Sequence, residues 1–323
     1  MAPQLVGRQS RAFILPQSAA GTAASGDHQP FGYYALTPRR NDPLEDDPII
    51  DAGLHNVMDN QAPAEGLIDA GVDLDVPLSF TELGLFLPHL FNAAAPSGSD
   101  PYDHVFTSGQ REPAGASIAW IDGDEWQRAH TWTPSRMEIG VAQESGRRRV
   151  RFSGMASDID EEISDPTGTP LSALAASIMP AGPGAVVRYD GTVMANLVGG
   201  SVFYERQLEA HRPAGRADRT ALEFTPQVPG RAGGDLRLRI KDRAFYKIAR
   251  SKDAAPVEIE YSLSPSAKLV LAFAAVRLVP AERPIEGPGP RTENYTMRAE
   301  QTGAAPMLTA TLTNGVASYP AAA

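Results

Sequence analysis

The six histidines are the first side chains to examine for catalysis or metal binding. They are scattered, at positions 28, 55, 89, 104, 130 and 211. No two have the H-x-H, H-x-x-x-H or H-E-x-x-H spacing that would bring two imidazoles onto one metal ion. The chain has no cysteine, so a thiolate nucleophile, a disulfide framework and a cysteine-ligated metal are excluded. The sequence therefore predicts neither a metal site nor a catalytic histidine.

The other sequence signatures of catalysis are also missing. There is no G-x-S-x-G nucleophile elbow and no S-x-x-K, and the two G-P-G triplets contain a proline that fits neither phosphate-binding glycine loop. Carboxylates cluster at 42–51, 122–125 and 158–165, and any two of them could in principle form the acid and nucleophile of a glycosidase. The 158–165 run lacks the glycine and the spaced glutamate of an EF-hand loop. We interpret these runs as solvated acidic loops and expect no enzymatic activity and no cofactor.

Three tryptophans keep one binding function open. Trp120, Trp126 and Trp132 lie within thirteen residues and could stack on sugar rings beside nearby carboxylates. A carbohydrate-binding or carbohydrate-active β-protein is therefore an alternative. Tryptophans on alternating strands are more often core or interface residues, which favours a structural reading.

Composition narrows the class of protein further. The chain has 323 residues, 42% of them hydrophobic and 21% charged, with 29 glycines and 28 prolines, which favours many turns and short strands over long helices. A net charge of −10 repels nucleic acid and acidic membrane surfaces. The longest uncharged apolar run, 269–276, is too short to cross a bilayer, and no export signal is visible near the N-terminus. We expect a folded protein that assembles in a reducing cytosol and has no membrane partner.

Two stretches predict a strand followed by a short helix. Residues 72–78 alternate apolar and polar side chains, and Ser79 and Glu82 then form an S-x-x-E capping box before a helical pattern that Pro88 interrupts. Residues 235–241 alternate in the same way, and Asp242 is placed to cap a helix containing Phe245 and Ile248. The halves therefore repeat one order of elements. We predict a mainly β (α+β) fold of two tandem β-sandwich or barrel-like domains, 1–175 and 176–323, each with one short flanking helix.

Further strands follow from alternation and turn residues. Met137–Ala142 and Arg149–Phe152 are predicted to form a hairpin, and 158–183 is the candidate linker. An Asn314-Gly315 turn is expected to join two strands at the end of the chain. The other predicted strands are 13–15, 31–36, 102–106, 117–121, 129–133, 257–263, 268–279, 294–299, 308–313 and 316–319.

These elements resemble a known family. The Glu82–Leu87 helix, Tyr102–Phe106, Ser117–Trp120, the 136–152 hairpin and the closing 308–319 pair with Asn314 are similar in order to major tail tube proteins of long-tailed (siphovirus-type) bacteriophages. The resemblance implies rings stacked into a tube through which DNA is ejected. Two tube domains in one chain imply trimeric rings with pseudo-sixfold symmetry, whereas a single domain would imply a hexamer. A single-ring virion component, such as a tail terminator or a head-tail joining protein, is the nearest alternative.

The resemblance also implies partners and a location. The chain would bind itself within and between rings, and other tail proteins at the tube ends. Phage DNA would pass through the lumen without specific binding, and an acidic lumen would keep it from sticking. The protein would reside in the virion after assembly in the bacterial cytoplasm.

Three groups of charged residues are candidates for contacts between subunits. Asp73 and Asp75 take the repeat positions of Arg237 and Arg239, so neighbouring domains around a ring could present opposite charges. The basic cluster Arg147, Arg148 and Arg149, continued by Arg151, is expected to pair with carboxylates of a neighbouring subunit. A proline-broken loop from Arg39 to Asp51 is the candidate contact between rings, with these charged residues: Arg39, Arg40, Asp42, Glu45, Asp46 and Asp47.

Overall fold

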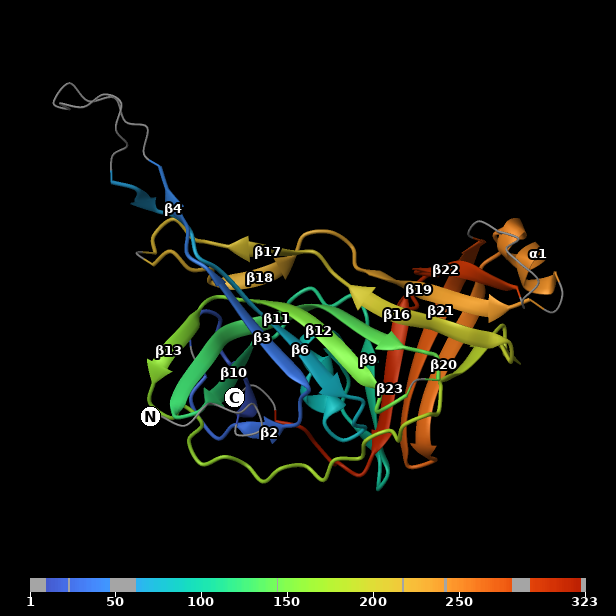
Figure 1. The fold of residues 1–323 in the computed structure, drawn as a ribbon, viewed down its shortest axis with the longest axis horizontal. Helices are drawn as coiled ribbons and strands as arrows, with labels where there is room; N and C mark the ends of the chain where they lie inside the picture. The colour runs from blue at the N-terminus through green and yellow to red at the C-terminus, as the bar shows by residue number, and fades with distance from the viewer. Residues whose placement is uncertain are drawn as a thin grey trace.

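The structure of the protein is a computed structural model that describes residues 10–22, 24–46, 62–143, 145–216, 218–240, 243–280 and 291–320. Most of these residues lie in antiparallel β-strands, which confirms the predicted mainly-β class (Figure 1). The elements fall into two consecutive sets. The first set consists of β1 (Arg11–Pro16), β2 (Gln29–Phe31), β3 (Ala35–Asn41), β4 (Leu44–Glu45), β5 (Ala64–Glu65), β6 (Asp69–Pro77), the 3₁₀ turns η2 (Leu83–Leu85) and η3 (Leu87–His89), β7 (Asn92–Ala93), β8 (Ser97–Gly98), β9 (Tyr102–Thr107), β10 (Ala116–Asp122), β11 (Glu125–Gly140), β12 (Arg149–Ala156) and β13 (Ile159–Ile163).

The second set follows an extended segment, 164–185, that contains no strand. It consists of β14 (Val186–Tyr189), β15 (Thr192–Val193), β16 (Leu197–Glu205), β17 (Leu208–His211), β18 (Glu223–Pro226), β19 (Arg231–Arg239), helix α1 (Ala244–Ser251), β20 (Ala255–Ser264), β21 (Ala267–Pro280), β22 (Thr292–Glu300) and β23 (Leu308–Asn314).

The same pattern of strand pairing occurs in both sets. In the first set β1 pairs with β2 and β10, β10 pairs with β11, and β11 pairs with β13 through its first half and with β12 through its second half. β12 then pairs with β6, and β6 with β3. In the second set β14, β15, β16, β19, β20, β21, β22 and β23 repeat the pairings of β1, β2, β3, β6, β10, β11, β12 and β13. The repeated element order seen in the sequence thus has a counterpart in the topology.

The two sets share one sheet. The second half of β11 pairs with β16 over Arg136–Gly140, and β23 pairs with β9, which carries β7 and β8 and has no counterpart in the second set. Together they form a continuous 19-stranded sheet that folds over one hydrophobic core. The proposed boundary between 175 and 176 lies in the strand-free segment between the sets, and the division into two domains stays a prediction.

Each set also carries a two-stranded arm, which connects the two strands of a hairpin. The hairpin is β3–β6 in the first set and the equivalent β16–β19 in the second set. The first arm joins β3 to β6 and contains β4 and β5; the second arm joins β16 to β19 and contains β17 and β18. In Figure 1 the first arm projects from the body at upper left, and the second arm extends toward its base. Part of the sequence predicted as the 39–51 loop is therefore strand and arm.

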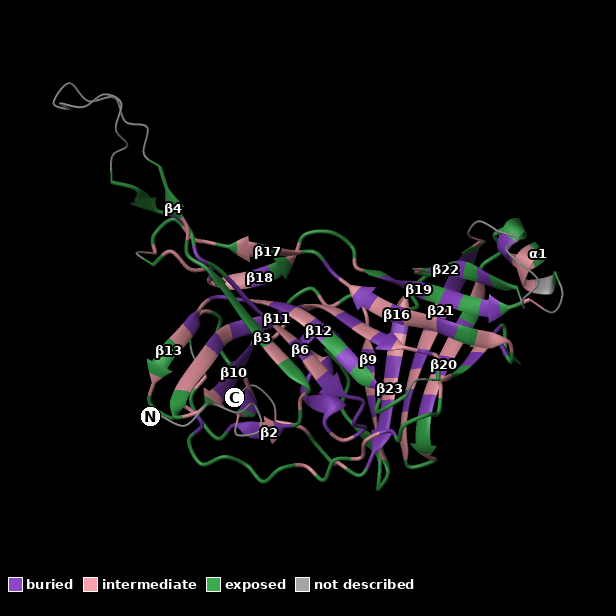
Figure 2. Cartoon of the chain, viewed as in Figure 1, coloured by how far each residue is buried: buried purple, intermediate pink, exposed green. Residues whose placement is uncertain are grey.

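Alternation places apolar side chains on the inner face of these strands, as predicted. In β6 and β19 the side chains of Val72, Leu74, Leu236 and Leu238 are buried, whereas the intervening charged residues point outward (Figure 2). Aromatic rings fill the space beneath the first set, with Phe86 stacked on Phe152 at 5.3 Å between ring centroids. Burial of this face drives the sheet to curl around the core.

The two predicted helices are of different types in the structure, the first 3₁₀ and the second α. Residues 79–90 form two 3₁₀ turns rather than an α-helix, and the Glu82 backbone N–H donates to Ser79 Oγ at 3.3 Å, as one half of a capping box. Pro88 lies early in η3, where its missing N–H leaves no bond broken. The Glu82 carboxylate instead accepts from the Gly32 N–H at 3.1 Å, and burial raises its pKa. The short helix predicted here is therefore present as 3₁₀ turns.

The second helix is confirmed as α1, whose Phe245 meets Tyr189 edge-on at 6.4 Å. Its proposed cap, Asp242, lies outside the described residues. Two further differences concern strands. The predicted strands 129–133 and 137–142 belong to the single long strand β11, and 316–319 is irregular rather than a strand. At that end Tyr319 packs over Gly84, and its hydroxyl donates to the Thr81 carbonyl.

We expect Leu236→Ala to lower the free energy of unfolding by about 2–4 kcal/mol, because the side chain is fully buried and its removal leaves a cavity. Val198→Ala on the adjacent strand β16 is the matched control, because Val198 is 42% exposed. It should change the free energy of unfolding by less than about 0.5 kcal/mol. Urea unfolding followed by tryptophan fluorescence measures both. Equal stabilities of the two variants would contradict the assignment of β19 to the core.

Candidate assembly interface

Charged side chains form rows across the outward face of the sheet. Asp75 of β6 lies opposite Arg151 of β12, which lies opposite Glu138 of β11. Arg151 Nε is 3.1 Å from Asp75 Oδ1, and Arg149 reaches the same carboxylate at 3.7 Å. Asp73 pairs with Arg39 of β3 at 3.3 Å. Both aspartates predicted to contact a neighbouring subunit are thus already ion-paired within the chain.

The row continues across the junction between the two sets. Arg136 of β11 bonds Glu205 of β16 at 2.5 Å and Glu138 at 3.0 Å, and its guanidinium lies 4.5 Å from the centroid of the Phe203 ring. These partly exposed pairs each contribute little stability, but they match charge across neighbouring strands and so fix their register.

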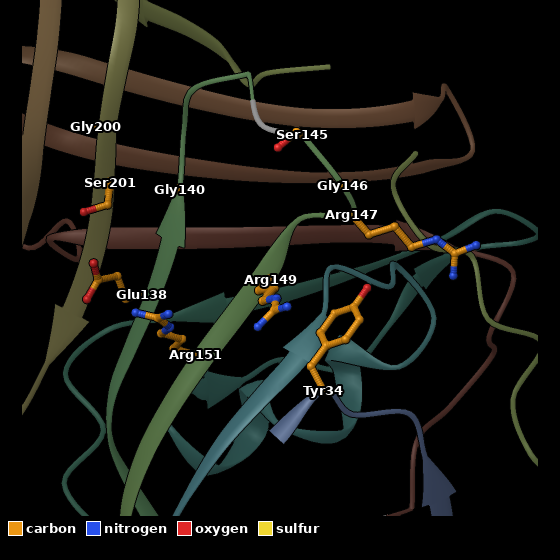
Figure 3. A pocket seen from close by; sticks show the side chains of 10 residues that line it. All are labelled: Tyr34, Glu138, Gly140, Ser145, Gly146, Arg147, Arg149, Arg151, Gly200 and Ser201. Atoms are coloured by element: carbon orange, nitrogen blue, oxygen red, sulfur yellow. The ribbon is translucent and has the colours of Figure 1, made fainter. Parts of the chain in front are cut away.

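The basic cluster lines a shallow cleft of about 540 Å³ at the β11–β12 turn. Figure 3 shows Arg149 and Arg151 between Glu138 and Tyr34, and Arg147 directed away from them. The Arg149 guanidinium lies 4.6 Å from the centroid of the Tyr34 ring. Arg147 and Arg149 are exposed, and their contact with a neighbouring subunit stays a prediction.

Arg148 has a different environment from its neighbours. It is 3% exposed, and its guanidinium donates to the carbonyls of Gly140, Ala142 and Pro183. It holds the β11–β12 turn against the segment before β14. In the single chain, therefore, it is not a surface group.

Sequence reasoning missed a second buried arginine, Arg206, at the base of the second arm. It is 4% exposed and donates to the carbonyls of Pro134, Leu90 and His89 and to Gln110 Oε1. Burial lowers its pKa to about 10, and the guanidinium stays charged at neutral pH. No local sequence pattern distinguishes such an arginine from an exposed one, because its acceptors are carbonyls from distant segments.

Arg237 and Arg239 lie on the outward face of β19 and are exposed. β19 is flanked by β16 and β22, and β6 is flanked by β3 and β12, so neither strand is at a sheet edge. The ends of the β3–β6 and β16–β19 pairings align Asp73 with Asp235 and Asp75 with Arg237, so the repeat positions predicted for Arg237 and Arg239 are wrong by two residues. A contact of these arginines with Asp73 and Asp75 of another copy stays a prediction.

The residues of the predicted inter-ring loop occupy β3 and the first arm. Arg40 bonds Asp158 at 2.8 Å and Asp42 at 3.2 Å, whereas Glu45 and Asp46 are exposed. Asp47 lies outside the described residues. The role of this segment in contacts between rings stays a prediction.

The first arm has a partner that no pattern in the sequence predicts. Arg219 of the second arm lies 2.6 Å from Asp42 and 3.3 Å from Glu65, and Arg212 lies 2.6 Å from Asp69. The Ile68 N–H also donates to the Arg219 carbonyl at 3.1 Å. The tip of the second arm is thereby bound to the base of the first.

Among the strand edges that have no partner within the described residues, two lie at related positions of the two sets, one on β3 and one on β21. β3 pairs on one side with β6 only. Residues 277–280 of β21 pair on one side with β22 only, and the edge they leave open corresponds to the edge of β11 that β16 occupies. Since β3 is the counterpart of β16, and β21 that of β11, the two open edges could pair with each other as β16 and β11 do. Unpaired edges recruit further strands.

The candidate groups for chemistry do not converge on a reactive site. Trp132 is fully buried, with its indole N–H bonded to the Val72 carbonyl at 2.9 Å, and Trp120 is 5% exposed, so neither of these two rings is available to stack on a sugar. His130 Nε2 bonds Asp160 at 2.7 Å beside Arg128, an arrangement that ties β11 to β13. Within the described residues no group of three His, Asp or Glu side chains could hold a metal ion.

No helix in the described part of the chain is long and apolar enough to cross a membrane.

The described residues thus form a repeated β-fold with open strand edges and rows of paired charges on its outward face. The family model for phage tail tube proteins matches residues 7–299. The chain therefore belongs to the phage tail tube protein family, and its role is that of a structural component of the virion. No curated protein matches it.

The pair His130–Asp160 gives a pH-dependent prediction. The hydrogen bond from His130, followed by that from Arg128, lowers the pKa of Asp160 from 3.8 to about 2. A carboxyl with a lowered native pKa stabilises the fold above its unfolded pKa, and this stabilisation is lost as the pH falls from about 4 toward 2. We expect Asp160→Asn to cost about 1 kcal/mol at pH 7 and progressively less below pH 4.

Unfolding by urea at several pH values measures this difference. The control is Asp124→Asn, which removes an exposed carboxylate in the β10–β11 turn and should follow the wild type at every pH. A constant cost for Asp160→Asn down to about pH 2 would contradict the assigned pairing.

Proposed function

We propose that the protein self-assembles into rings that stack to form the tail tube and so line the conduit for DNA ejection. Each chain would supply two pseudo-equivalent units, and three chains would close a ring of pseudo-sixfold symmetry. Other tail proteins would bind the tube ends. The observation that carries this proposal is the β11–β16 junction inside the chain.

The internal junction provides the geometry for ring closure. β16 pairs with the open edge of β11 through Arg136–Gly140. The corresponding edge of β21, at 277–280, is open, and β3, the counterpart of β16, has an open edge of its own. If β3 of one copy pairs with β21 of the next, every junction around the ring repeats the internal one. Closure removes both edges, which otherwise promote unregulated association.

The outward sheet face is a suitable lining for a DNA channel. Several of its acidic and basic side chains are paired with each other, as in Asp75–Arg151 and Arg136–Glu205. Paired charges leave few free cations to hold phosphates, so DNA would slide without specific binding. The net charge of −10 does not describe this face. Residues 41–70 carry eight carboxylates and no Lys or Arg, and the remaining residues carry 31 carboxylates against 29 Lys and Arg.

Negative-stain electron microscopy of the purified protein over a range of concentrations tests the proposal directly. We expect stacked rings with a central channel. Discrete rings that never stack would favour a tail terminator or head-tail joining protein, and single particles under all conditions would contradict self-assembly.

Cysteine pairs test the ring junction, since the chain has no cysteine of its own. Val279 and Thr37 are exposed on the outward faces of β21 and β3. We expect Val279→Cys combined with cysteine at position 35, 37 or 39 to give disulfide-linked oligomers up to three chains in at least one register. Thr37→Cys with Ser266→Cys, in the exposed β20–β21 turn, is the matched control. Absence of linked oligomers for all three pairs would reject this junction.

A further inference from the structure

The two arms occupy equivalent places in the two sets but carry opposite charge. The first arm and its flanks, residues 41–70, have eight carboxylates and no Lys or Arg. The second arm and its flanks, residues 206–231, have five arginines and three carboxylates. Such a difference between duplicated elements points to two different contact partners.

One of these partners is visible inside the chain. The tip of the second arm supplies Arg212 and Arg219, which bond Asp69, Asp42 and Glu65 at the base of the first arm. Arg212 also donates to the Ile68 carbonyl at 2.9 Å, and Arg219 to the Gly66 carbonyl at 2.8 Å. A basic tip thus lies on an acidic base. Figure 1 shows the second arm reaching back over the first set toward this base.

The base of the second arm has the reverse charge. Asp69 begins β6, and Arg231 begins β19 at the equivalent position, because each is paired with the last residue of the preceding strand of its hairpin, Asn41 and Glu205 respectively. Arg231 is exposed and has no carboxylate within ion-pair distance among the described residues. Beside it Val228 is 43% exposed. A groove of about 300 Å³ at this base is lined by Gln207, Val228, Pro229 and Arg231, among others.

The first arm offers the matching group. Leu44 is 68% exposed, and the next two residues, Glu45 and Asp46, are exposed acids with no ion-pair partner among the described residues. The arm projects beyond β3, the strand at the open edge of the sheet. A copy that binds the edge of β3 would therefore lie beside the base of this arm.

We propose that the acidic first arm of one copy docks on the base of the second arm of the neighbouring copy, with Glu45 and Asp46 beside the partner's Arg231. This inference rests on the proposed ring, since it repeats between chains the arm contact seen within the chain. Leu44 would fill the groove at Val228 and Pro229 of the partner subunit. Opposite charges would then meet at both kinds of contact. The acidic first arm would meet the basic base of the second arm between chains, as the basic second arm meets the acidic base of the first arm within a chain.

Charge reversal and its compensation test the contact. Arg231→Glu should raise the critical concentration for assembly by about tenfold, since it replaces an attraction with a repulsion at an exposed site. Glu45→Arg with Asp46→Arg should do the same. All three changes together should restore assembly to within about twofold of the wild type. Arg250→Glu, on the exposed face of α1, is the matched control and should have no effect. Circular dichroism and thermal unfolding establish that each variant is folded.

A second measurement does not depend on affinity. Asp46→Cys and Arg231→Cys in one chain should form disulfides between copies under mild oxidation, and neither single variant should do so. If the wild type assembles while the reversed variants assemble equally well and the cysteines do not link, the arm contact is wrong and the ring proposal stands. If the wild type forms neither rings nor tubes, the ring proposal itself fails.

Discussion

Pairing of backbone groups at sheet edges is the constraint on which the architecture depends. Each set of strands has one pairing edge on β11 or its counterpart β21, and another on β3 or its counterpart β16. The chain satisfies one such pair of edges internally, through β11 and β16. The other pair, β21 and β3, lies at opposite ends of the same succession of strands. In the proposed ring, the contact between copies would repeat this internal junction.

The distribution of charge differs between the sheet face and the arms. On the outward face, acids and bases from adjacent strands neutralise each other row by row, as Asp75, Arg151 and Glu138 do. The unbalanced charge is concentrated in the arms, which lie beyond the sheet. Buried arginines have a third role: Arg148 and Arg206 donate to backbone carbonyls of turns and loops that have no strand partner. Arginine thus has three roles, according to its surroundings. It forms ion pairs between strands, donates to carbonyls of loops, or lies exposed at the base of an arm.

Local pattern in the sequence was sufficient for the strands and their faces. Alternation predicted β6 and β19 with the correct buried side, and turn residues predicted the β11–β12 hairpin. The local pattern was not sufficient where tertiary contacts determine the type of helix or the burial of a side chain. The helical spacing of 83–90 is compatible with 3₁₀ turns that wedge Phe86 between Phe31 and Phe152, and no local signal separates these alternatives. Likewise, adjacent arginines at 147–149 differ in burial because only Arg148 faces the carbonyls of a distant segment.

Duplication within one chain also explains why the two arms differ. In a ring of six identical single-unit chains, every arm would meet an identical base, so one arm would have to be complementary to its own base. With two units per chain, the two kinds of contact become independent, and their charges can diverge. A basic arm on an acidic base within the chain then leaves the acidic arm and the basic base for the contact between chains. Like charges would meet if two first units or two second units came together, so the pattern favours strict alternation of the units around the ring.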